Sequence, residues 1–235
     1  MTADRIRQAL AAAASPEKAE VSRRFFKTGP EYSAGDHFIG VPVPEQRKIA
    51  KRFSGRSLTD TGTLLQSPIH EERLTALFLL VRSFEKGDAA TRKQVVDLYL
   101  KNTAYVNNWD LVDSSAYHIL GAWLLDKDRS ILSQLAVSPH LWERRIAIVA
   151  TEAFIRAGES KDTFEIAQLL LGDKHDLMHK AVGWMLREVG KHSGPEVLRG
   201  FLAAHASKMP RTALRYAIEH FSETERKAWL ARPTR

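Results

Sequence analysis

The chain has 235 residues, of which 44% are hydrophobic and 27% charged, a composition that is typical of globular proteins and excludes disorder along the whole chain. No apolar run is long enough for a transmembrane helix, and the start MTADRIRQALAAAAS lacks the layout of a signal peptide. The absence of cysteine excludes disulfides, iron–sulfur clusters, cysteine-ligated zinc and a cysteine nucleophile. The net charge of +7 favours a polyanionic partner, most commonly nucleic acid.

Helical periodicity dominates the sequence. An amphipathic helix is predicted over residues 1–15, and apolar side chains recur on one helical face in 71–84, 144–155 and 180–189. The one strand-like run, FIGVPV at 38–43, contains proline and is a poor sheet member. Serine and proline mark helix starts and glycine marks helix ends, at Ser15, Pro16, Pro44, Ser67, Pro68, Ser138, Pro139 and Pro210, and at Gly55, Gly87, Gly158, Gly172 and Gly194. The sequence therefore predicts an all-α fold.

Long apolar helices recur at a nearly constant interval. Equivalent starts at residues 70, 109, 142, 176 and 210 give steps of 39, 33, 34 and 34 residues, and shorter helices precede long ones at 88–100, 129–137 and 161–171. Helix pairs at this interval predict a solenoid. The tetratricopeptide signature W-x-x-L-G-x-x-Y is absent, and the uneven steps favour HEAT-like pairs. We expect one domain over 1–235, a right-handed α-solenoid with a concave basic groove, and a long loop at 28–43 of the kind that often carries function.

The densest group of polar and aromatic residues is NNWDLVD at 107–113. Either asparagine can cap a helix that begins near Trp109. Asp110 and Asp113 then share a face in its first turn, with Trp109 one turn before Asp113. Spacing alone favours a structural interpretation, because carboxylates near a helix start complement the helix dipole and a tryptophan is often a core residue.

Basic and aromatic side chains also mark three later segments. Arg144 and Arg145 in LWERRIA cannot share one helix face, so one of them is expected to face a groove or a partner; phosphate contact competes there with ordinary solvation. Arg211 and Arg215 lie four residues apart and form a basic stripe. Trp184, in HKAVGWMLREVGK, is by itself more typical of core packing.

The segment HDLMH, residues 175–179, spaces two histidines as in the zinc helix H-E-x-x-H. Asp176 replaces the glutamate of that motif with an acid too short to act as a general base, and no obvious third ligand follows. We therefore predict no metal and no cofactor. The G-x-S-x-G elbow, the glycine-rich phosphate loop and the dinucleotide fingerprint are also absent from the sequence, which leaves serine hydrolases, kinases and Rossmann enzymes without support.

Six segments, in order and nearly end to end, resemble the DNA alkylation repair family, the AlkD-type alkylpurine DNA glycosylases built of HEAT-like repeats. They are RRFFKTGPEY (23–32), GDHFIGVPVP (35–44), NNWDLVD (107–113), LWERRIAIVA (141–150), DKHDLMHKAVGWMLREVGK (173–191) and MPRTALRYAIE (209–219). The resemblance implies hydrolysis of the N-glycosidic bond of 3-methyladenine and 7-methylguanine in double-stranded DNA. Since the matched motif holds no nucleophilic lysine, we expect a monofunctional enzyme with no lyase step.

The resemblance also implies residue roles, which replace the structural interpretations above. The catalytic aspartate of the family falls on Asp113 in W-D-x-V-D, and the neighbouring aromatic on Trp109. The second lesion-contacting aromatic falls on Trp184 in G-W-x-L-R-E, and the functional arginine of W-x-R-R on Arg145. With Arg145, the residues expected to contact DNA phosphates are Arg144, Lys180, Arg187, Arg211 and Arg215.

Two positions depart from the family pattern. Pro42 stands where relatives often carry arginine, which removes one potential DNA contact. Asn108 stands where the best-known members carry tryptophan, which puts the shape of the lesion pocket in question. Neither departure changes Asp113.

Three hypotheses stay open at this point. The first is a glycosylase that uses Asp113, and the second is a non-catalytic HEAT-like scaffold that binds damaged or branched DNA. Retention of Asp113, Trp109 and Trp184 favours the enzyme. The third, a protein-binding solenoid, would not need a basic surface. We expect a cytoplasmic monomer that is not attached to a membrane and is nucleoid-associated when bound to DNA. The sequence fixes neither the preferred alkylpurine nor whether the base is flipped out.

Overall fold

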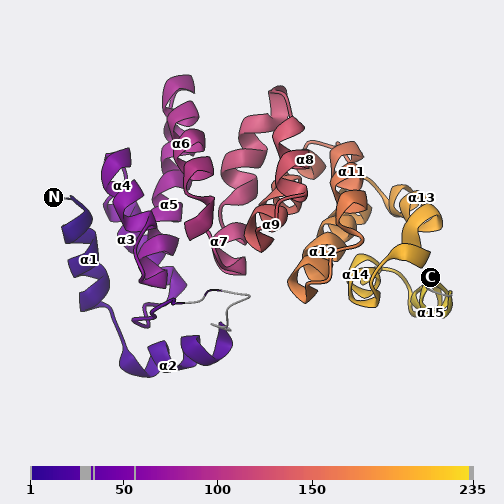
Figure 1. The fold of residues 1–235 in the computed structure, drawn as a ribbon, viewed down its shortest axis with the longest axis horizontal. Coiled ribbons are helices and arrows are strands. Elements are labelled where there is room, and N and C mark those ends of the chain that lie inside the picture. Colours follow the sequence, from indigo (N-terminus) through magenta and orange to yellow (C-terminus); the bar gives the residue numbers. More distant parts are fainter. Residues whose placement is uncertain (1, 27–32, 34, 56, 233–235) are drawn as a thin grey trace. The chain divides into compact units, whose positions relative to one another are not determined.

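A computed structural model describes residues 2–26, 33, 35–55 and 57–232, and its regular elements are helical (Figure 1). Within these ranges the sole β-type pairing is an isolated bridge between His37 and Ile69, so the all-α prediction is confirmed. The 38–43 run forms no strand, because proline cannot donate to a ladder and Pro42 instead precedes a helix that begins at Val43. Of the predicted 28–43 loop, residues 28–32 and 34 lie outside the described residues.

The chain divides into two compact units, Met1–Ser115 and Ala116–Arg235. Each unit contains one helix of 17 residues against which several others pack. The expectation of a single domain over 1–235 stays a prediction, as do the handedness and the concave basic groove. In the part of the chain that the structure describes, no helix combines the length and apolar character that crossing a bilayer requires.

The first unit is built around α5. Its helices are α1 (Thr2–Ala12), α2 (Pro16–Phe25), α3 (Val43–Arg52), α4 (Leu58–Leu65), α5 (His70–Lys86), α6 (Ala89–Lys101), the 3₁₀ turn η1 (Thr103–Tyr105) and α7 (Trp109–Asp113). Leu74, Leu77 and Leu80 of α5 are fully buried, and α5 packs against α3, α4 and α6. Figure 1 shows α2 lying crosswise below these helices instead of beside them.

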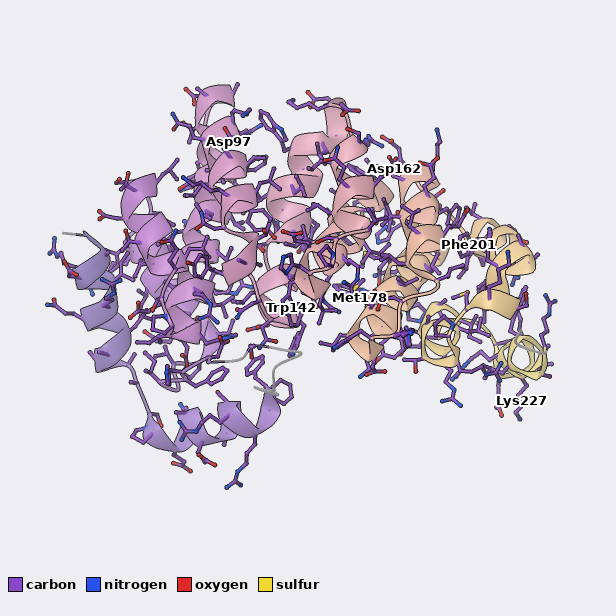
Figure 2. All side chains as sticks on the ribbon, viewed as in Figure 1. Asp97, Trp142, Asp162, Met178, Phe201 and Lys227 are labelled. Carbon is purple, nitrogen blue, oxygen red and sulfur yellow. The ribbon has the colours of Figure 1, made fainter. Side chains whose placement is uncertain are left out.

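The second unit is built around α12. Its elements are the π-helical turn η2 (Tyr117–Gly121), η3 (Leu124–Asp126), α8 (Ser130–Ala136), α9 (Leu141–Ala150), α10 (Glu152–Arg156), α11 (Lys161–Leu170), α12 (Asp176–His192), α13 (Pro195–His205), η4 (Ala206–Lys208), α14 (Arg211–Ala217) and α15 (Glu223–Ala231). The helix α12 packs against α9, α11, α13 and α14. Trp142 at the start of α9 and Met178 near the start of α12, both labelled in Figure 2, are buried.

Helix starts follow the sequence predictions. The helices predicted from residues 70, 109, 142, 176 and 210 begin at His70, Trp109, Leu141, Asp176 and Arg211, and the shorter ones correspond to α6, α8 and α11. Several predicted caps also occur; for example, the Ser15 side chain accepts the N–H of Lys18 at the start of α2. The all-helical order and spacing are consistent with an α-solenoid.

The prediction of a long helix from residue 109 is wrong, because the helix found there has only five residues. The helix α7 ends at Asp113, and the hydroxyl of Ser115 donates to the carbonyl oxygen of Leu111 at 2.6 Å. A side-chain hydrogen bond of this kind competes with the helical ladder. The chain then passes through a turn into η2.

The helix predicted over 144–155 is also interrupted. The helix α9 ends at Ala150 and α10 begins at Glu152. The hydroxyl of Thr151, at the break, donates to the carbonyl oxygen of Ile148 at 2.7 Å. The apolar periodicity continues across the break, which is why the pattern alone did not reveal it.

Candidate functional site

The short helix α7 carries Trp109 and Asp113. Asn108 precedes it with extended backbone, and its side-chain oxygen accepts the N–H of Trp109 at 2.8 Å, which confirms the predicted cap. Leu111 and Val112 are fully buried and pin one side of the helix into the unit. Asp113 closes α7 in a half-exposed position, one turn after Trp109.

The carboxylate of Asp113 affects the pKa of Tyr99, a fully buried residue of α6. Burial raises the pKa of the Tyr99 hydroxyl, its hydrogen bond with Ser115 opposes that shift, and the charge of Asp113 adds to it. The Tyr99 hydroxyl lies 3.1 Å from Oγ of Ser115. Asp113 itself stands at the partly exposed end of α7, where a carboxylate can act electrostatically on a bound cation.

Trp109 belongs to an aromatic cluster in the first unit. Its ring lies 5.5 Å from that of Phe26 in a stacked arrangement and 5.8 Å from that of Phe25 in an edge-to-face arrangement. Phe26 in turn stacks on Phe38 at 5.4 Å. Phe25 is 65% exposed, so the cluster reaches the surface. Sequence reasoning missed the three phenylalanines because positions 25, 26 and 38 are far from α7 in sequence.

His70, the first residue of α5, is held between two carboxylates. Its Nδ1 lies 3.0 Å from Oδ2 of Asp36 and its Nε2 2.8 Å from Oδ2 of Asp110, and the residue is 2% exposed. Burial by itself lowers the pKa of His70, but the charge and hydrogen bond of Asp110 and the hydrogen bond of Asp36 outweigh it and raise the pKa to about 9. At neutral pH His70 is therefore an imidazolium that donates from both ring nitrogens.

Arg73 and Asn107 complete this arrangement. Arg73 Nη2 lies 2.5 Å from Oδ2 of Asp36 and donates to Oδ1 of Asn107 at 3.0 Å. Asn107 Nδ2 donates to Oδ1 of Asp36 at 3.3 Å. Burial by itself raises the pKa of Asp36, but the hydrogen bond of His70 and the charge of Arg73 outweigh burial and lower the pKa below its usual value. This carboxyl is therefore ionised at neutral pH. We call Asp36, His70, Arg73 and Asp110 the charge array.

In the second unit, the predicted phosphate ligands Arg144 and Arg145 lie on α9. Arg145 is 5% exposed and its Nη1 donates to the carbonyl oxygen of Leu177 at 2.7 Å. Arg144 is half-buried; its Nε donates to Asp173 at 2.7 Å and its Nη1 to the carbonyl oxygen of Ser138 at 3.0 Å. Both side chains hold α9 against neighbouring backbone, and their contacts with DNA stay predictions.

Trp184 is half-buried on α12. Its neighbour Gly183 allows α14 to approach closely, because a Cβ there would lie 2.4 Å from the carbonyl oxygen of Ala213. Arg145 on α9 contacts Leu177 at the start of α12, so the helices that carry Arg145 and Trp184 are in direct contact within the second unit. Trp109 and Asp113 lie together on α7 in the first unit.

The remaining predicted phosphate ligands lie on α12 and α14. Arg215 is exposed. The other three have partners within the second unit, which are Asp176 for Lys180 (2.6 Å), Glu188 (3.1 Å) and Glu219 for Arg187, and the carbonyl oxygen of Leu230 for Arg211. A phosphate would have to compete with these partners or extend the networks they form.

The histidines of HDLMH serve the start of α12. Nδ1 of His175 accepts the N–H of Leu177 at 3.2 Å, and Nε2 of His179 lies 2.6 Å from the carbonyl oxygen of Asp173. Across the described ranges, no group of three or more histidine, aspartate or glutamate side chains is arranged to hold a metal ion.

Comparisons with known proteins give one family match and a similar solved structure. The family described as "DNA alkylation repair enzyme" matches residues 6–221. A solved structure described as "Predicted DNA alkylation repair enzyme from Enterococcus faecalis" superposes with a TM-score of 0.69 at 19% identity, covering 89% of this chain and 97% of that one. At that identity the superposition shows a shared fold. No curated protein sequence matches significantly.

Proposed function

Because the chain belongs to the DNA alkylation repair family, we propose that it is a monofunctional alkylpurine DNA glycosylase acting on double-stranded DNA. The proposed substrates are cationic purines, 3-methyladenine and 7-methylguanine. The observation that carries the proposal is the half-exposed carboxylate of Asp113 at the end of α7, one turn after the clustered ring of Trp109. The family description, an alkylation repair enzyme, supports an enzymatic role.

The chemistry requires little from the protein beyond charge and position. A purine alkylated at N3 or N7 is already cationic, so it leaves as a neutral base when the bond from C1′ to the ring nitrogen breaks and its electron pair goes to the base. Positive charge then develops on the sugar, as in glycoside hydrolysis. The Asp113 carboxylate stabilises that charge and orients the water that adds to C1′ and loses one proton to Asp113 or solvent.

The aromatic and basic residues would supply recognition. Tryptophan faces attract cations by about 0.5–2 kcal/mol per contact, so Trp109 and Trp184 favour the charged lesion over a normal base. Arg145 is the proposed phosphate contact next to the lesion. The surrounding phosphate contacts proposed are Arg144, Lys180, Arg187, Arg211 and Arg215.

Single-turnover release of 7-methylguanine from a duplex oligonucleotide tests the proposal, with the wild type measured beside Asp113→Asn. The variant keeps the size and hydrogen-bonding capacity of the side chain and removes its charge. We expect release by the wild type and a rate constant lower by about a hundredfold or more in the variant, as for removal of one electrostatic stabiliser in other enzymes. DNA affinity should stay unchanged.

Absence of release by the wild type, on 7-methylguanine and on 3-methyladenine DNA, would sink the proposal for these lesions. Salt-dependent binding to duplex or branched DNA without release would then favour the non-catalytic scaffold. Failure to bind DNA at any salt concentration would favour a protein-binding solenoid.

A further inference from the structure

The helix α7 is too short to hold itself in place. It has five residues, Trp109–Asp113, whereas helix formation has a costly nucleus and isolated helices below about 12 residues are marginal in water. It is followed by a turn at Ser114 and Ser115. The position of α7 must therefore be set by what its side chains contact.

Polar side chains at the start of α7 reach two other segments. Asn107 bonds Asp36 and Arg73, and Asn108 Nδ2 donates to the hydroxyl of Ser33 at 3.3 Å. Asp110 meets His70, as described above. Three side chains within four positions thus fix α7 to Ser33, to the 35–40 segment and to the first turn of α5.

The first turn of α5 also holds the 35–40 segment. The carboxylate of Glu71 accepts the N–H of Gly40 at 2.7 Å and that of Ile39 at 3.1 Å, and the N–H of His70 donates to the carbonyl oxygen of His37 at 2.9 Å. Gly40 lies in the left-handed region with a φ of 78°, and a Cβ there would lie 2.1 Å from the carbonyl oxygen of Ser15. The segment therefore has little freedom to shift.

His70 links these parts through its charge. Asp36 faces it from the 35–40 segment, Asp110 from α7, and Arg73 from its own helix. It is also faced by the ring of Phe26, which directly follows α2, and by that of Phe38, with centroids at 5.0 and 4.8 Å. Aromatic faces favour a cation, so the surroundings of His70 are suited to imidazolium.

Stability alone does not account for such an arrangement. Burying charges is costly, and apolar residues of similar volume often give equal or greater stability than a buried ion pair. Moreover, Oδ1 of Asp110 is buried and has no hydrogen-bond partner among the described residues. A directional, charged anchor differs from apolar packing in that it fixes orientation, and α7 is the element whose orientation matters for the proposed reaction.

We propose that His70 is a positioning residue for base excision: held between Asp36 and Asp110, it fixes α7 so that Asp113 and Trp109 meet the bound nucleotide. This inference rests on the proposed glycosylase function. His70 does not touch the substrate in this proposal; it acts through Asp110. Catalysis should therefore depend on the charge of His70, even though no proton of His70 is transferred.

The test compares His70→Gln with the wild type in single-turnover base release from pH 6 to 9.5. The glutamine can still donate to Asp110 but carries no charge. At pH 7 we expect the rate constant to fall by about 10- to 100-fold, the scale of a misplacement of about 1 Å, while DNA affinity changes little. The wild-type to variant ratio should shrink as pH approaches and passes about 9, the pKa of His70, and the ratio cancels any titration of the substrate.

His37→Gln is the matched control, because His37 is an exposed histidine of the same unit that bonds its neighbours through its backbone. Its ratio to the wild type should stay near one at every pH. Equal rates for His70→Gln and the wild type would overturn the proposal. So would a loss that is the same at every pH, because that reports a weakened fold and not a missing charge.

If His70→Gln does not fold, the pH dependence of base release by Asp110→Asn tests the proposal instead. This variant removes one of the two carboxylates that hold the proton on His70, so the alkaline decline of its rate should begin at lower pH than in the wild type. An unchanged alkaline decline would overturn the proposal.

Hydrogen exchange separates failure of this inference from failure of the proposed function. At pH 7 the amides of residues 109–115 should exchange faster in His70→Gln than in His37→Gln, with α12 unaffected. If the wild type releases no base and α7 nevertheless exchanges faster, the proposed function fails while the hold of His70 on α7 stands. Equal exchange in the two variants overturns that hold.

Discussion

The helices α7 and α12, which carry the two tryptophans expected to contact the lesion, are held in different ways. Trp109 lies on a five-residue helix anchored by hydrogen bonds and buried charges to α5, Ser33 and the 35–40 segment. Trp184 lies on a helix of 17 residues that packs against α9, α11, α13 and α14. Met178, Met185 and Leu186 of that helix are fully buried.

The difference teaches which kind of substitution should disturb each helix. Apolar packing is spread over many contacts, so the position of α12 should depend on volume and close fit. Besides the buried Leu111 and Val112, the position of α7 depends on a few directional contacts between polar and charged groups that are largely shielded from water. The position of α7 should therefore be more sensitive than that of α12 to single polar substitutions and to pH.

The largest effect is expected from His70→Leu. The substitution leaves Asp36 and Asp110 buried without their shared cation, and breaking a buried charge pair in this way costs about 3–5 kcal/mol. Urea unfolding followed by circular dichroism measures the loss. Lys93→Ala is the control, because it breaks an exposed pair with Asp97 on α6 and should change the free energy of unfolding by less than about 1 kcal/mol. Equal losses in both variants would contradict the distinction between buried and exposed charges.

The next effect is a pH dependence of stability. The pKa of His70 rises from 6.5 to about 9 on folding, so its contribution is fully present below pH 6.5 and is lost as pH rises toward 9. By linkage the loss is on the order of 3 kcal/mol. The pKa of Asp36 is lowered on folding, so its contribution is present above pH 3.8 and is lost as pH falls below that value.

Denaturant titrations of the wild type and His70→Gln between pH 6.5 and 9.5 isolate the histidine, because all other titrating groups are shared and the chain has no cysteine that would titrate in this range. The stability difference between the two should shrink as pH rises. A difference that stays constant would show that His70 contributes as a neutral ring.

A smaller loss of stability is expected from overpacking the contact between α12 and α14. Gly183→Ala places a Cβ 2.4 Å from the carbonyl oxygen of Ala213 and 2.5 Å from Cβ of Tyr216, and overpacking of this kind costs about 1–3 kcal/mol. Gly200→Ala is the matched helical control: nothing lies within 4 Å of its added Cβ, so it should stabilise by up to about 1 kcal/mol. The loss in Gly183→Ala should not vary with pH. A loss of stability that varied with pH would contradict the claim that close packing, and not charge, determines the position of α12.

The sequence predicted the helices well and the candidate site in part. Proline, serine and glycine act locally, so they mark starts such as Pro16 and His70 correctly. The charge array could not be predicted, because Asp36 and Asp110 lie 34 and 40 residues from His70 and only tertiary packing brings them together. The interruption after Asp113 was missed because it depends on a side-chain hydrogen bond of Ser115, to which hydrophobic periodicity is blind.

The measurement that tests the account most directly is an NMR titration of the histidine Cε1–Hε1 signals in the full chain, with the His70 signal assigned by its absence in His70→Gln. The account predicts that His70 stays protonated through neutral pH and titrates near 9. A His70 signal that titrates near 6.5 would show a neutral ring between Asp36 and Asp110, and would contradict the claim that a buried imidazolium holds α7 in place.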